Sequence, residues 1–263
     1  MLWLVLVVLV LAILAAGCVR EAGGTPDDPS PTVERRQLTV FAASSLAGAF
    51  REIVGDFELA HEGVDVAVNV GPSDGLAAQI QSEGTADVFA SASESWMDVV
   101  VRTTGVLHRE DFVRNSLVVI MPADNPAEIE SLEDLATPGI QLVLAADGVP
   151  AGDYAREVLR NADLVEPVLA NVVSNEEDVA AVVAKVSAGE ADAGIAYVSD
   201  VSVAANTELT SIDIPDDVNV VATYPIAVIA GTNEPELARE FIGWMSTAQG
   251  KAVLEDYGFD TFD

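Results

Sequence analysis

The sequence is poor in cysteine, histidine and basic residues, and these shortages limit what the protein can do. Cys18 is the only cysteine in 263 residues, and there are two histidines. Lys and Arg total 12 against 43 Asp and Glu, a formal net charge of −31. Such a charge argues against binding to nucleic acid or to anionic lipid. The acids are spread along the chain, which is typical of a solvated acidic surface and suits a protein adapted to high salt.

An apolar run opens the chain and ends in small residues before the cysteine, "MLWLVLVVLVLAILAAGC". A transmembrane anchor is the alternative, but 17 residues is short for a membrane span. We therefore predict that residues 1–17 are a lipoprotein signal peptide and that Cys18 is lipidated. No thiol then remains for a disulfide, a metal or catalysis. Residues 18–37 are rich in Pro, Gly and Asp and are predicted to be a disordered linker at the outer face of the cytoplasmic membrane.

The rest of the chain alternates strand-like and helix-like segments. "LTVFAA", "VDVAVNV" and "ADVFAS" are each followed by a predicted helix, over 45–60, 74–81 and 94–104. A second set contains "IQLVLA", a helix after Pro150, a helix in "DVAAVVAKV" and the strand "AGIAYV". This alternation predicts an α/β fold with largely parallel sheets. The echo of "SEGTAD" (82–87) in "SAGEAD" (187–192) indicates two lobes on one plan.

Two helices, over 234–246 and 248–257, end the chain and need a lobe to cover their apolar faces. We expect them to return to the first lobe, so that 112–121 and 218–230 cross between lobes. The predicted lobes are 38–119 plus 224–263, and 120–223. Ligands commonly bind in clefts of this kind.

Several predicted helices begin directly after a strand, where free N–H groups and the positive end of the helix dipole favour an anion. Ser44 and Ser45 stand at the first such junction, and either could also be the N-cap. Pro150 and Ala151 begin another helix, with an unpaired N–H at Ala151.

"GPSDG", Gly71 to Gly75, stands at a further junction and also fits the G-x-S-x-G elbow of serine hydrolases. A hydrolase needs a histidine well after Ser73. His61 precedes Ser73 and His108 follows too soon, so hydrolysis through Ser73 is a minor alternative and we predict no enzyme activity.

The helix in "SNEEDVAAVV" permits two starts. Ser174 and Glu177 could form a capping box, or Asp178 could be the N-cap and leave the N–H of Val179 free. Tyr197 ends a strand, so its hydroxyl could face either the cleft or water.

Eight segments together resemble the molybdate-binding proteins of bacterial and archaeal ABC transporters. They are "TVFAASSL", "ADVFASASESWMD", "NSLVVI", "VPAGDYA", "EDVAAVV", "GIAYVSD", "YPIAVI" and "YGF", between residues 38 and 259. The resemblance implies a two-lobed type II periplasmic-binding-protein fold that closes on a tetrahedral oxyanion. The contacts that it implies with molybdate or tungstate fall on Ser45, Ser73, Ala151, Val179 and Tyr197.

The resemblance further implies an extracytoplasmic receptor that delivers the oxyanion to an ABC permease and its ATPase, without a resident cofactor. Asp74 departs from the resemblance, which implies a small or hydroxylic residue after Ser73. An acid beside the site would repel a dianion or accept a proton from hydrogen phosphate. Receptors for sulfate or phosphate, and a sensor without transport, therefore stay as alternatives.

Overall fold

The computed structural model describes residues 35–203 and 208–262. The predicted signal peptide, Cys18 and the linker as far as residue 34 lie outside these residues. Within the described residues, no helix combines the length and the apolar character that crossing a membrane requires.

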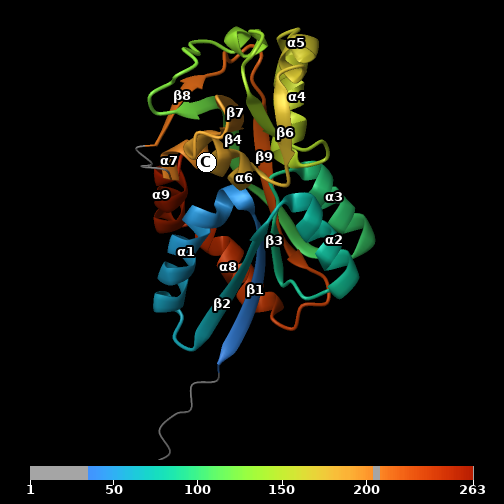
Figure 1. The fold of residues 1–263 in the computed structure, drawn as a ribbon. Coiled ribbons are helices and arrows are strands. Elements are labelled where there is room, and N and C mark those ends of the chain that lie inside the picture. The colour runs from blue at the N-terminus through green and yellow to red at the C-terminus, as the bar shows by residue number, and fades with distance from the viewer. Residues whose placement is uncertain (1–34, 204–207, 263) are drawn as a thin grey trace, which may run out of the picture. The chain divides into compact units, whose positions relative to one another are not determined.

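Ten strands form one sheet in the order β2-β1-β3-β9-β4-β7-β5-β6, with β8 and β10 both paired to β4 (Figure 1). The strands are β1 (Arg36–Ala43), β2 (Val64–Gly71), β3 (Val88–Ala90), β4 (Val106–Pro122), β5 (Leu142–Ala145), β6 (Val172–Glu176), β7 (Ala193–Tyr197), β8 (Leu209–Asp213), β9 (Val221–Ile229) and β10 (Asp260–Thr261).

The helices mostly follow the strands, which confirms the predicted α/β fold. They are η1 (Ser44–Leu46), α1 (Ala47–Ala60), α2 (Ser73–Glu83), α3 (Glu94–Thr103), η2 (Glu133–Ala136), α4 (Pro150–Asn161), α5 (Val165–Leu169), α6 (Val179–Ser187), α7 (Val198–Val203), α8 (Pro235–Met245) and α9 (Ala248–Asp256). The short elements η2, α5, α7, β6, β8 and β10 were not predicted, because segments this short carry too few periods of an apolar pattern.

The outer strands pair in parallel and the central strands pair antiparallel. β1 is parallel to β2 and β3, and β5 is parallel to β6 and β7. Every antiparallel pair involves β4 or β9. These two long strands contain the segments predicted to cross between lobes.

Strand β4 changes partners along its length. Residues from Val106 to Ser116 pair with β9, and residues from Leu117 onward pair with β7 and β8. The predicted lobe boundary after residue 119 falls just inside the second stretch. The division into lobes at these boundaries stays a prediction.

Apolar side chains of β1 alternate between two clusters, as the geometry of a strand requires. Val40 joins the large cluster that contains Phe57 of α1 and Phe241 of α8, whereas Phe41 joins the smaller cluster with Ile80 of α2. Helices therefore cover both faces of the sheet around β1. This burial fixes the carboxyl ends of the strands, where the helices begin.

Candidate functional site

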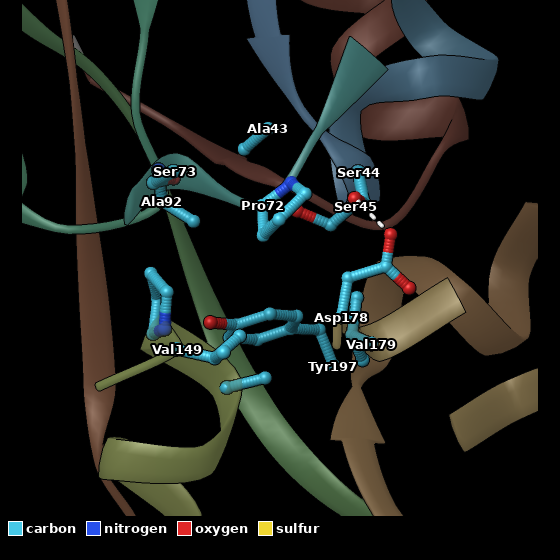
Figure 2. Close-up of a pocket in the computed structure, with 12 residues that line it drawn as sticks. Ala43, Ser44, Ser45, Pro72, Ser73, Ala92, Val149, Asp178, Val179 and Tyr197 are labelled. Atoms are coloured by element: carbon cyan, nitrogen blue, oxygen red, sulfur yellow. Dashed lines mark hydrogen bonds between the residues drawn. The ribbon is translucent and has the colours of Figure 1, made fainter. Parts of the chain in front are cut away.

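A small pocket lies where strands β1, β2, β5, β6 and β7 end (Figure 2). It holds about 230 Å³ of space free of protein atoms, part of it open to solvent. Because part of this volume is open solvent, the enclosed space is smaller still, and the pocket suits a small guest. Its lining consists of Ala43, Ser44, Ser45, Pro72, Ser73, Ala92, Val149, Pro150, Ala151, Asp178, Val179 and Tyr197.

All five predicted contact residues line this one pocket, although 152 positions separate the first from the last in sequence. In Figure 2, Ser45, Pro72 and Ser73 lie on one side of the space and Val149, Val179 and Tyr197 on the other. The first group follows β1 and β2, and the second belongs to the segment from α4 to β7. The pocket therefore joins the two halves of the described chain.

Four helices begin at the pocket. Ser73 is the first residue of α2, Val179 is the first of α6, and Ala151 is the second of α4 after Pro150. Ser45 lies in η1, which continues into α1. The N–H groups in the first turn of a helix have no partner within that helix and carry the positive end of its dipole. The chain thus aims four positive helix ends at one small space.

The two adjacent serines do not cap the helix, contrary to one of the roles considered for them. The N-cap of η1 is Ala43, and it makes no side-chain capping bond. The Ser44 hydroxyl instead donates to Asp178 Oδ2 at 2.8 Å, the dashed line in Figure 2. Ser45 Oγ lies 3.0 Å from the Tyr224 hydroxyl. The tertiary fold supplies both partners, from residues that sequence spacing does not connect.

The Ser73 hydroxyl oxygen is held by one hydrogen bond. Its oxygen accepts a hydrogen bond from the Ala92 N–H at 3.0 Å. Because that bond uses an oxygen lone pair, the hydroxyl proton is free to be donated into the pocket.

The start of α6 follows the second of the two predicted arrangements. Asp178 is the N-cap, and its Oδ1 accepts from the Ala181 N–H at 2.8 Å. Ser174 instead accepts a hydrogen bond from Lys185 at 3.0 Å. Since Oδ2 of Asp178 is taken by Ser44, both carboxylate oxygens already have donors.

The start of α4 lies unusually close to the end of β5. A side-chain carbon at Gly152 would lie 2.1 Å from the carbonyl oxygen of Ala146 and 2.4 Å from that of Ala145. Only glycine permits this approach. The neighbouring residue, Ala151, lines the pocket.

Tyr197 is 1% exposed and extends from the end of β7 into the pocket. Its hydroxyl has no hydrogen bond of ordinary geometry to the described residues. Burial, followed by the nearby Tyr224 hydroxyl, raises its pKa well above the usual value. Tyr197 is therefore a neutral, buried donor without an acceptor. Such an unpaired group lowers the free energy of unfolding by about 1 to 3 kcal/mol.

The lining formed by the described residues contains no Lys, Arg or His. Asp74 is not among the lining residues either. The pocket thus presents hydroxyl and backbone N–H donors, and its one carboxylate, Asp178, is already hydrogen-bonded.

The histidines lie elsewhere, which removes the basis for a serine hydrolase. His61 is the C-cap of α1 and stacks on Phe57, with ring centroids 4.0 Å apart. His108 Nε2 lies 2.8 Å from Glu110 Oε2. Neither lines the pocket around Ser73.

Three polar residues behind the pocket were not singled out from the sequence: Tyr224 and Asn115 are buried, and Asp200 is partly exposed. Tyr224 and Asn115 bond each other, and Asp200 Oδ2 accepts from the Tyr197 N–H at 3.0 Å. Burial raises the pKa of Asp200 to about 7, against the opposing effect of that bond. A tyrosine in the apolar segment "YPIAVI" was a usable signal for Tyr224, because a buried tyrosine hydroxyl usually has a polar partner.

The chain is similar to known solute-binding proteins. The model of the bacterial extracellular solute-binding protein family matches residues 38–260. The molybdate-binding protein ModA of Mycobacterium tuberculosis is 38% identical over 255 residues, 95% of each chain. That of Escherichia coli is 32% identical and covers 85% of this chain and 88% of its own.

A solved structure has the same fold. The periplasmic molybdate-binding protein of Azotobacter vinelandii superposes with a TM-score of 0.76 at 21% identity, covering 86% of this chain and all of the other. This likeness concerns the fold alone.

Proposed function

Because the chain belongs to the bacterial extracellular solute-binding protein family, we propose that it captures molybdate or tungstate in the pocket and delivers it to an ABC permease driven by an ATPase. The family consists of solute-binding proteins, in agreement with the prediction that the chain is not an enzyme. The observation that carries the proposal is the buried, unpartnered hydroxyl of Tyr197 in a pocket lined by donors.

The donors come from the five residues that we propose as ligands of the anion. The hydroxyls of Ser45, Ser73 and Tyr197 and the N–H groups of Ser45, Ser73, Ala151 and Val179 give about seven. Hydrogen bonds to a charged partner contribute roughly 1.5 to 3 kcal/mol each, so the gross attraction is on the order of 10 to 20 kcal/mol. Desolvation and ordering of the protein offset a large share. Helix ends and hydroxyls can therefore stabilise the charge without a cationic side chain.

The donor set favours a fully ionised, tetrahedral oxyanion. Sulfate has the same charge but is smaller, so some donors would lie out of its reach in a rigid pocket. Molybdate and tungstate are nearly alike in size and charge, and the proposal covers both. Hydrogen phosphate is disfavoured because its proton would need an acceptor, and Asp178, the one carboxylate of the lining, already accepts from Ser44 and from the Ala181 N–H.

Binding is proposed to favour the closed arrangement of the two halves, because donors from both sides contact one anion. The permease would then recognise the closed form. The sequence signal at Cys18 supports a lipid anchor that keeps this receptor at the outer face of the cytoplasmic membrane.

Calorimetric titration of the purified protein tests the proposal. Molybdate and tungstate should bind, and sulfate and phosphate should bind more weakly. The variants Ser73→Ala and Tyr197→Phe should each weaken the binding of molybdate, whereas Ser82→Ala, at an exposed serine outside the pocket, should not. A protein that binds none of the four anions would overturn the proposal.

A further inference from the structure

Behind the pocket, a chain of hydrogen bonds ends at the Ser45 hydroxyl. Asn115 is 1% exposed, and its Nδ2 donates to Ser199 Oγ at 2.8 Å and to the Tyr224 hydroxyl at 3.4 Å. Tyr224 is fully buried, and its hydroxyl lies 3.0 Å from Ser45 Oγ. The Tyr197 hydroxyl also lies near the Tyr224 hydroxyl, without a hydrogen bond of ordinary geometry between them.

The chemistry of these groups gives the chain a direction. An amide nitrogen can only donate, so the Tyr224 oxygen accepts from Asn115. The single proton of Tyr224 is then directed to Ser45 Oγ, its partner at 3.0 Å. Because Ser45 accepts from Tyr224, its own proton is left for the pocket.

We propose that Asn115 and Tyr224 are positioning residues that fix the Ser45 hydroxyl as a donor toward the bound anion. Neither side chain lines the pocket. Without them, the Ser45 hydroxyl could rotate and present a lone pair to the guest. The relay therefore selects against anions that carry a proton and favours fully ionised ones. This inference rests on the proposed function.

Tyr224 also suits the role through its surroundings. Its ring packs edge-on against Tyr197 and Phe259, with centroids 5.8 and 5.6 Å away. Burial raises its pKa far above the ordinary value, so the proton stays on the hydroxyl. Two aromatic contacts fix the ring, and its oxygen lies within hydrogen-bond distance of Ser45 and Asn115.

The first experiment is a double-mutant cycle read by molybdate titration. Tyr224→Phe should lower the affinity about threefold to tenfold, the effect of one hydrogen bond. In a Ser45→Ala background the same change should have no further effect, because Tyr224 acts through Ser45. Tyr257→Phe, at a tyrosine outside the pocket, is the matched control and should bind as the wild type. An equal loss from Tyr224→Phe in both backgrounds would overturn the relay.

The second experiment reverses the direction of the chain. In Asn115→Asp the carboxylate accepts from Tyr224, Tyr224 accepts from Ser45, and Ser45 offers a lone pair to the anion. At mildly alkaline pH, molybdate and hydrogen phosphate both carry two charges, so repulsion by the new acid weakens both equally. The relay predicts that the ratio of their affinities shifts at least tenfold toward hydrogen phosphate. An unchanged ratio would contradict it, whether binding falls or not.

Failure of the relay can be told apart from failure of the proposed function. If the wild type binds no molybdate, the proposed function is wrong. If the wild type binds and Tyr224→Phe behaves as the wild type, only the relay is wrong. Thermal unfolding without ligand shows whether each variant is folded before it is titrated.

Discussion

At the scale of the residue, Tyr197 has an unfavourable feature that a bound anion would remove. Its hydroxyl is buried and lacks a partner. Substitution by phenylalanine should therefore lower the affinity for molybdate roughly tenfold and leave the free protein as stable as before or more stable, by up to about 1 kcal/mol. Titration and denaturant unfolding measure the two effects. A variant that is less stable but binds normally would show that Tyr197 serves only the core.

Asp200 gives a pH dependence whose sign follows from its raised pKa. Burial raises that pKa from 3.8 to about 7, so the folded state holds a proton that the unfolded state has released between these values. The contribution of Asp200 to stability is therefore complete below pH 3.8 and is lost as the pH rises through about 7.

Asp200→Asn should remove this dependence. Relative to the variant, the wild type should lose stability between the two pKa values by at most about 1.4 kcal/mol per pH unit. Denaturant unfolding of both proteins at several pH values measures the difference. Parallel stability curves for the two proteins would show that the Asp200 carboxyl titrates normally.

At the scale of the element, the starts of η1 and α6 are held together across the pocket. Ser44 donates to Asp178, which also caps α6. Ser44→Ala removes the bond across the pocket and keeps the cap. We expect the anion to leave about threefold to tenfold faster, because one stabilising bond of the closed form is lost. Stopped-flow release of molybdate measures the rate.

The matched control for Ser44→Ala is again Ser82→Ala. It removes an exposed serine hydroxyl near the end of α2, away from the pocket. Asp178→Ala should release the anion faster still and should also cost about 1 kcal/mol of stability through the lost N-cap. Equal release rates for Ser44→Ala and the wild type would show that the bond does not stabilise the closed form.

At the scale of the whole molecule, the net charge of −31 governs the response to salt. Like charges repel in the compact state, and salt screens this repulsion over about 8 Å at physiological strength. The free energy of unfolding should rise between dilute buffer and molar salt. Denaturant unfolding with sodium chloride, at constant pH, measures the change. Equal stability in both would contradict the interpretation of the acidic surface as an adaptation to salt.

The local pattern was enough to predict most of the α/β order. Strand and helix periods placed the helices after β1, β2 and β3 to within about two residues of their observed bounds. Gly84 and Gly189 follow the ends of α2 and α6 in the left-handed conformation, with φ of 63° and 68°, as is common for glycine after a helix. Hydrophobic periodicity and left-handed glycine are properties of neighbouring residues, and neighbours suffice to produce them.

Some residues of the pocket could also be predicted from the local sequence pattern. A strand followed at once by a helix marks a free helix start, and this marked Ser45, Ser73 and Ala151. The choice of Asp178 as N-cap, with Val179 next, needed the tertiary structure, because two caps were compatible with the spacing. The direction of Tyr197 also needed it, since a residue at the end of a strand can face a cleft or water.

What only the folded chain decides is which distant polar groups meet. Ser44 meets Asp178 across 134 residues, and Ser45 meets Tyr224 across 179. No local period encodes such pairs, because they depend on how the sheet order brings strand ends together. Residue order alone therefore determined the elements and their free helix starts, whereas the packing of β4 and β9 between the outer strands determined that those starts surround one pocket.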